Sequence, residues 1–183
     1  GGGLPDGVVD IDEEPATNLK NLAQAKKVDV SDLVVCILDR PRHEQLISKV
    51  RDAGARIMLI SDGDISAVMS TSEADSGVDI YIGSGGAPEG VLAAAALRCI
   101  GGQMQGRLLF RNDDERRRAT NCGITDFDRK YGLYDLASGD VMFSATGVTN
   151  GTMLKGVRRF SGGATTHSVV MRSRSGTVRY IEA

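Results

Sequence analysis

A glycine-rich turn is the first candidate for chemistry, with the sequence Gly-Ser-Gly-Gly-Ala-Pro-Glu-Gly over residues 83–90. It follows an expected strand at 78–82 and precedes an alanine-rich helix expected from Val91 to Ile100. Glycines let the backbone approach a ligand, and a helix N-terminus presents free N–H groups to an anion such as phosphate. The turn lacks the complete GxGxxG pattern and the Lys-Ser/Thr of a P-loop. A tight structural turn is the alternative interpretation.

Glu89 is the unusual residue of this turn. A bare carboxylate at the rim of a phosphate-sized cradle would repel the phosphate. A divalent cation between the two groups would remove the conflict, because Mg²⁺ and Mn²⁺ bridge carboxylate and phosphate oxygens. Glu89 is therefore a candidate metal ligand. The alternative is helix capping, since an acid in the first turn is stabilised by the helix dipole.

A second candidate is the sequence Asp62-Gly63-Asp64, which lies where another expected strand ends. Paired carboxylates at this position can bind a metal or accept hydrogen bonds from sugar hydroxyls. The same three residues are also common in turns and at helix N-caps, which is the alternative interpretation.

A third candidate is the pair of arginines that bracket a proline in Arg40-Pro41-Arg42. The planar guanidinium fork suits phosphate, and the proline stiffens the segment that presents it. Two surface arginines without a ligand are the alternative. We interpret His43, which follows directly, as a histidine on a helix surface, with a contact to phosphate as the alternative.

Three repeats of a strand followed by a helix position these turns. The expected strands cover residues 33–38, 56–61 and 78–82, and the first is a continuous apolar run typical of a strand buried on both faces. This alternation indicates a parallel or mostly parallel sheet with right-handed crossovers. Ligands of such sheets bind beyond the carboxyl ends of the strands. We therefore expect the three polar turns to converge at one edge of one sheet.

The rest of the chain is less regular. Its pattern predicts a strand within 103–110, a polar helix over 113–122, and further strands at 141–147, 165–172 and 177–181. Together with the first three repeats, this predicts an α/β fold with a mixed, mostly parallel sheet flanked by helices. The length of 183 residues favours one compact domain over residues 1–183.

Composition and charge exclude several classes of protein. The formal net charge of -2 argues against a nucleic-acid binder, and no apolar run is long enough to predict a membrane span. The three cysteines are far apart and include no CxxC pair, which indicates neither a disulfide framework nor a zinc site. This cysteine usage fits a reducing, cytoplasmic location.

The charge is unevenly distributed toward the C-terminus. One acid, Glu182, stands there against several cations, namely Lys155, Arg158, Arg159, Arg172, Arg174 and Arg179. Such a stretch can meet an anionic ligand or another subunit. A solvated, charge-studded hairpin is the alternative.

Five motifs follow one another in a fixed order. They are Leu-Asp-Arg-Pro-Arg-His at 38–43, Ser-Asp-Gly-Asp at 61–64, the glycine-rich turn at 83–90, Gly-Arg-Leu-Leu at 106–109, and Phe-Ser-Ala-Thr-Gly-Val-Thr-Asn-Gly at 143–151. In this order they resemble the GlpX-type, or class II, bacterial fructose-1,6-bisphosphatases. The resemblance runs from Pro5 to the end of the chain.

This resemblance implies the C-terminal α/β domain of the sugar-phosphatase fold. It implies hydrolysis of the 1-phosphate of fructose 1,6-bisphosphate in gluconeogenesis, with Mn²⁺ or Mg²⁺, by a cytoplasmic enzyme that we expect to be a homo-oligomer, a dimer or a tetramer. By the family's motifs Glu89 is a metal ligand. The positions that match substrate-binding residues are Arg40, Pro41, Arg42, Asp62, Gly63, Asp64 and Gly86.

One departure from the family pattern is important. The family's other metal ligands lie in acidic N-terminal motifs that nothing in this sequence matches. We therefore expect residues 1–183 to be the substrate-binding half of the enzyme without its metal-binding half. Alone, this half should have little or no phosphatase activity. Three alternatives stay open: activity on sedoheptulose 1,7-bisphosphate as well, a nucleotide-binding Rossmann-like module, and a non-catalytic assembly domain.

Overall fold

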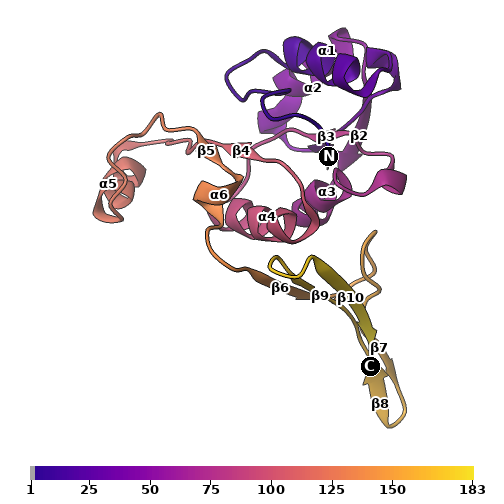
Figure 1. Ribbon diagram of the computed structural model, residues 1–183. Helices are drawn as coiled ribbons and strands as arrows, with labels where there is room; N and C mark the ends of the chain where they lie inside the picture. Colours follow the sequence, from indigo (N-terminus) through magenta and orange to yellow (C-terminus); the bar gives the residue numbers. More distant parts are fainter. Residues whose placement is uncertain (1–2) are drawn as a thin grey trace.

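A parallel sheet of three strands organises the first part of the chain in the computed structural model, which describes residues 3–183 (Figure 1). The strand order is β2-β1-β3, with β1 at Val34–Leu38, β2 at Arg56–Ile60 and β3 at Ile80–Tyr81. Both pairings of β1 are parallel. The predicted α/β class, with a parallel sheet flanked by helices, is therefore confirmed. The third strand is shorter than the predicted 78–82.

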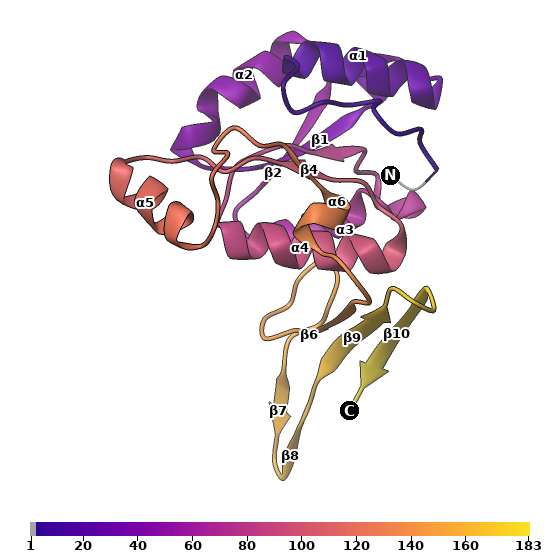
Figure 2. The same ribbon diagram turned by 60° about the vertical axis from the view of Figure 1, so that its left-hand side comes forward.

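Helices cover both faces of this sheet (Figure 2). They are α1 (Pro15–Lys26), α2 (Glu44–Asp52), α3 (Asp64–Ser70) and α4 (Ala87–Ile100), and short 3-10 turns stand at Val30–Asp32, Pro41–His43 and Ala74–Ser76. On one face, Val35 and Ile37 of β1 share a buried cluster with α1 and α2. On the other, Cys36 packs against Ala67 of α3. This alternation follows from the period of two in a strand, and it explains why the central strand is apolar throughout.

A second, antiparallel sheet follows in the order β10-β9-β6. Its strands are β6 (Met142–Thr146), β9 (His167–Arg172) and β10 (Thr177–Glu182), and one face of it packs on α4. The contact joins Phe143, Val169 and Met171 to Ala96 and Cys99 of α4. The later strands therefore form a separate sheet and do not join the parallel one, because α4 lies between the two.

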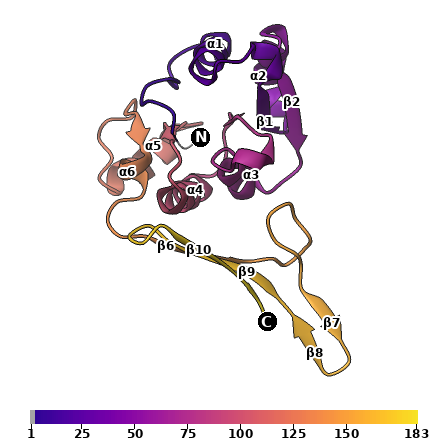
Figure 3. The same cartoon turned by 45° about the vertical axis from the view of Figure 1, so that its right-hand side comes forward.

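A hairpin of β7 (Arg158–Phe160) and β8 (Gly163–Thr165) extends away from the antiparallel sheet (Figure 3). The predicted strand at 165–172 thus divides into β8 and β9. The break lies at Thr166, whose N–H and C=O groups both bond to the backbone of Ala183. This hairpin and the loop before it carry half of the basic stretch noted in the sequence, namely Lys155, Arg158 and Arg159. The other three cations, Arg172, Arg174 and Arg179, lie in β9, in the turn after it and in β10.

The segment between the two sheets is mostly exposed. It contains β4 (Gln105–Gly106), α5 (Asp113–Asn121), β5 (Tyr131–Gly132) and α6 (Leu133–Leu136), and the predicted strand at 103–110 is reduced to β4. The helix α5 begins where its N-cap, Asn112, accepts a hydrogen bond from the N–H of Glu115 at 3.0 Å. Within residues 3–183, no helix combines the length and the apolar character that crossing a membrane requires.

Candidate functional site

The carboxyl ends of all three parallel strands meet at one edge of the sheet, as the sequence predicted. Three segments leave this edge, one after each strand: residues 39–43, 61–63 and 82–86. They are called the first, second and third strand-end loops here. Every residue predicted to bind substrate or metal lies in one of these loops or in the first turn of the helix that follows it.

Arg40 ties the first loop to the second. Its Nη2 donates to the backbone oxygen of Ser61 at 2.5 Å, and its Nη1 donates to the backbone oxygen of Asp39 at 2.8 Å. The N–H of Asp39 also donates to the carbonyl of Ile60 at 2.8 Å. The Arg40 guanidinium is therefore engaged with backbone carbonyls, and it fixes the distance between the two loops.

Arg42 ties the first loop to the third. Its Nε and Nη2 both donate to the backbone oxygen of Ser84, at 3.0 and 2.7 Å. Pro41 starts the 3-10 turn that carries Arg42, since its fixed φ and missing N–H suit the first position of a helical turn. Because arginine has five N–H donors and this side chain is exposed, donors remain for an anionic ligand.

His43 lies beneath these loops, and its predicted place on a helix surface is wrong. Its side chain is only 3% exposed. The N–H of Ser84 donates to Nε2 at 2.9 Å, so Nε2 is the accepting nitrogen and Nδ1 donates to the carbonyl of Leu38 at 2.8 Å. A Cβ added to Gly83 would lie 3.3 Å from the ring. The ring therefore connects the third loop to the end of β1. These two hydrogen bonds are called the His43 latch.

The second loop turns sharply at Gly63, whose φ of 80° is a conformation that residues with a side chain rarely adopt. This turn starts α3 at Asp64. The Asp64 Oδ2 lies 3.4 Å from the position of a Cβ on Gly85, so the carboxylate borders the third loop. Asp62 is exposed on the same loop. The two carboxylates thus flank a glycine as predicted, and Asp64 meets the glycine-rich turn.

Tyr81 is a site residue that the sequence analysis did not single out. It ends β3, and its hydroxyl lies 3.6 Å from the position of a Cβ on Gly83. Burial first, and then the negative charge of Asp64, raise the pKa of Tyr81 to about 12. The phenol therefore keeps its proton and can donate a hydrogen bond at this edge. Its position near the start of the glycine-rich turn was the one feature of the sequence that could have marked Tyr81 as a site residue.

Glu89 folds back over the N-terminus of α4. Gly86 is the N-cap of this helix, and a Cβ there would lie 3.0 Å from the Glu89 Cδ and would overlap its Oε2. Gly86 thus leaves room for a carboxylate above the free N–H groups of the first helical turn. The side chain is exposed, so it can act as a cap and still reach a ligand.

The described residues do not fit a complete metal site. Among residues 3–183, no three His, Cys, Asp or Glu side chains lie together in a way that could hold a metal ion. Glu89 and Asp64 both border the third loop, but among residues 3–183 they do not form a group of three or more potential ligands with other side chains. The predicted role of Glu89 as a metal ligand therefore remains a prediction for one donor of a larger set.

Comparison with known proteins agrees with the motifs. The family model for bacterial fructose-1,6-bisphosphatase, glpX-encoded, matches residues 1–183. A Microcystis aeruginosa protein described as D-fructose 1,6-bisphosphatase class 2/sedoheptulose 1,7-bisphosphatase is 43% identical, over 96% of this chain and 55% of its own length. Proteins of the same description from Crocosphaera subtropica and Trichodesmium erythraeum are 44% and 43% identical, over 96% and 95% of this chain and 55% and 54% of theirs.

The chain thus spans about half the length of the curated relatives it matches. The resemblance inferred from the five motifs is confirmed over the whole sequence. This chain belongs to the glpX-encoded family of bacterial fructose-1,6-bisphosphatases.

Proposed function

We propose that this chain binds the sugar and a phosphate of fructose 1,6-bisphosphate. It would do so as part of an enzyme that hydrolyses the 1-phosphate to give fructose 6-phosphate in gluconeogenesis. The observation that carries the proposal is the joining of three strand-end loops by Arg40, Arg42 and His43 at the N-terminus of α4. The names of the relatives support this substrate and add sedoheptulose 1,7-bisphosphate as a second one.

Each residue of this edge has a proposed role. The remaining donors of Arg42 and the free N–H groups at the start of α4 bind a phosphate, because both favour a dianion. Asp62 and Asp64 accept hydrogen bonds from sugar hydroxyls, and the protonated Tyr81 donates one. Arg40 holds the loops in register, so the phosphate and sugar contacts keep a fixed separation.

The enzyme is also proposed to use Mn²⁺ or Mg²⁺. Glu89 would supply one ligand, and the other donors would come from a part of the enzyme other than residues 3–183. The position of Glu89 over the N-terminus of α4 supports this role, because a cation there would sit between the carboxylate and a phosphate at the helix end.

Substitution of Arg42 tests the binding role. In Arg42→Gln, fructose 1,6-bisphosphate should bind at least tenfold more weakly, because a charge-assisted hydrogen bond contributes about 1.5–3 kcal/mol. Titration calorimetry of the 183-residue chain measures this change. Arg51→Gln is the matched control, since Arg51 is exposed in the last turn of α2 and should leave the affinity unchanged. Equal affinities of wild type and Arg42→Gln, or tighter binding of NAD or ATP, would contradict the proposal.

Catalysis should need more than this chain. We expect the 183-residue chain to release no phosphate from fructose 1,6-bisphosphate above background, with either Mn²⁺ or Mg²⁺, because Glu89 alone cannot clamp the reacting oxygens. A phosphate-release assay measures this directly. Turnover at about 10 s⁻¹, a typical enzymatic rate, would show that the chain holds a complete active site. The affinity for fructose 1,6-bisphosphate, measured with Arg42→Gln, tests the binding role independently of this result.

A further inference from the structure

We propose that the base of the β7–β8 hairpin is a second anion site, which binds the phosphate group of a sugar phosphate. A cavity of about 440 Å³ lies there, a volume within the usual range for small-molecule sites. Its lining comes from the loop before β7, the hairpin itself, and the ends of β9 and β10, and it includes Lys155, Arg158, Arg159, His167 and Glu182. This inference does not depend on the function proposed for the strand-end loops.

The charge of this cavity favours an anion. Three cationic side chains, Lys155, Arg158 and Arg159, line it together with one carboxylate, Glu182. The Lys155 Nζ lies 3.9 Å from Glu182, so the carboxylate is offset by a cation of the same cavity. Within residues 3–183 neither arginine forms an ion pair. Their guanidinium groups are therefore available for a phosphate, whose geometry they match.

His167 adds an oriented donor to the cavity. Its Nδ1 accepts a hydrogen bond from the N–H of Lys155 at 3.0 Å. Since Nδ1 is the accepting nitrogen, the ring proton is on Nε2, which can donate to a ligand. The ring also stacks on Tyr180, with centroids 5.9 Å apart and planes 26° apart. The direction of the donor is thus set before any ligand binds.

The loop over residues 147–157 holds Lys155 in place. The N–H of Val157 donates to the carbonyl of Val148 at 3.2 Å, and the N–H of Gly156 donates to Asn150 Oδ1 at 2.9 Å. A Cβ on Gly156 would lie 2.7 Å from the carbonyl carbon of Thr149, so the loop closes tightly on itself. A loop fixed in this way loses little conformational entropy when a ligand binds.

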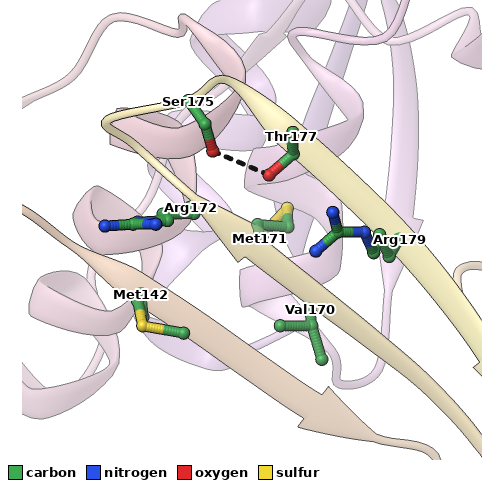
Figure 4. Close-up of a pocket in the computed structure, with 7 residues that line it drawn as sticks. All are labelled: Met142, Val170, Met171, Arg172, Ser175, Thr177 and Arg179. Carbon is green, nitrogen blue, oxygen red and sulfur yellow. Dashed lines mark hydrogen bonds between the residues drawn. The ribbon is translucent and has the colours of Figure 1, made fainter.

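A hollow on the other side of the same sheet offers a contrast (Figure 4). Its arginines, Arg172 of β9 and Arg179 of β10, lie around Met142 and Val170. This hollow has an apolar floor, a smaller volume of about 310 Å³ and no histidine. Three cations together with a histidine are therefore found at the hairpin base and not in this hollow, so they do not follow from the basic composition of the sheet alone. Arg179 serves as a matched control for Arg158.

The imidazole signals of His167 test this site. The chain has only two histidines, so the ring resonances of His43 and His167 can be assigned with the variant His167→Gln. Fructose 6-phosphate added at constant ionic strength should shift the Nε2 signal of His167 and saturate at a lower concentration than inorganic phosphate. Arg158→Gln should weaken this response at least tenfold, while Arg179→Gln and Arg42→Gln should leave it unchanged.

Four outcomes would overturn the proposal: no shift of His167 with fructose 6-phosphate, an equal response in Arg158→Gln, an equal loss in Arg179→Gln, or an equal shift with chloride. An unchanged response in Arg42→Gln supports a site separate from the strand-end loops. Loss of binding at those loops, by calorimetry, would leave the His167 result intact. The two sites can therefore fail independently.

Discussion

Alanine in place of Gly147 should lower the free energy of unfolding by about 3 kcal/mol, as expected when a side chain is forced into a packed site. A Cβ at this position would lie 2.9 Å from the carbonyl carbon of Lys155 and would overlap its oxygen. It would also lie 3.1 Å from the Cβ of Leu154, a buried residue of the core. Backbone atoms cannot rotate away, so the loop before β7 must shift or detach.

Urea denaturation of the purified chain measures this effect. Gly151→Ala is the matched control, because its added Cβ would make only an ordinary contact of 3.8 Å with Leu154. We expect the urea midpoint to fall in Gly147→Ala and to stay at the wild-type value in Gly151→Ala. The slope of the unfolding free energy against urea concentration should change little in either variant. A midpoint equal to that of wild type would show that the contact between Gly147 and Lys155 is not maintained in solution.

Local sequence patterns predicted the parallel sheet well. The run from Leu33 to Leu38 is apolar on both faces because both faces of β1 are covered, and this is visible without any knowledge of its partners. The helix α4 likewise carries its alanines between two layers. The helix α1 was not predicted. Its start depends on Asn18, a buried polar residue that bonds to the backbone of Asp10 outside the helix.

The antiparallel sheet could not be placed from the sequence. Alternation in β6, β9 and β10 predicts strands, but it does not say which face meets which helix. That choice depends on the contact of Phe143, Val169 and Met171 with α4, residues far apart along the chain. The division of the predicted strand at Thr166 has the same origin, because its partner is the C-terminal residue Ala183.

The candidate site shows the same division between local and distant information. Loops that follow parallel strands share one edge of the sheet. This rule was enough to predict that Arg42, Asp64 and Glu89 lie at the same edge. Their predicted ligands remain to be tested. The bonds that hold the loops could not be predicted, since Ser84 is an ordinary residue of a glycine-rich turn until it meets His43 and Arg42. Burial of a histidine after a proline turn has no pattern of its own in the sequence.

His43 should therefore be the most sensitive residue of the site in terms of stability. His43→Leu removes the acceptor of the Ser84 N–H and the donor to the Leu38 carbonyl. A buried polar group without a partner costs about 1–3 kcal/mol, so we expect the free energy of unfolding to fall by about 3 kcal/mol. Thermal or urea denaturation measures this loss.

Two further substitutions test the two hydrogen bonds of the His43 latch one at a time. Asparagine at 43 places its amide near Nδ1 and keeps a donor for Leu38, whereas glutamine places its amide near Nε2 and keeps an acceptor for Ser84. Each should cost less than leucine. Hydrogen exchange of the Ser84 amide distinguishes them: it should be fast in His43→Leu and His43→Asn and protected in His43→Gln. Protection of Ser84 in His43→Asn would contradict the latch, because the third strand-end loop would then be held by Arg42 and the start of α4 alone.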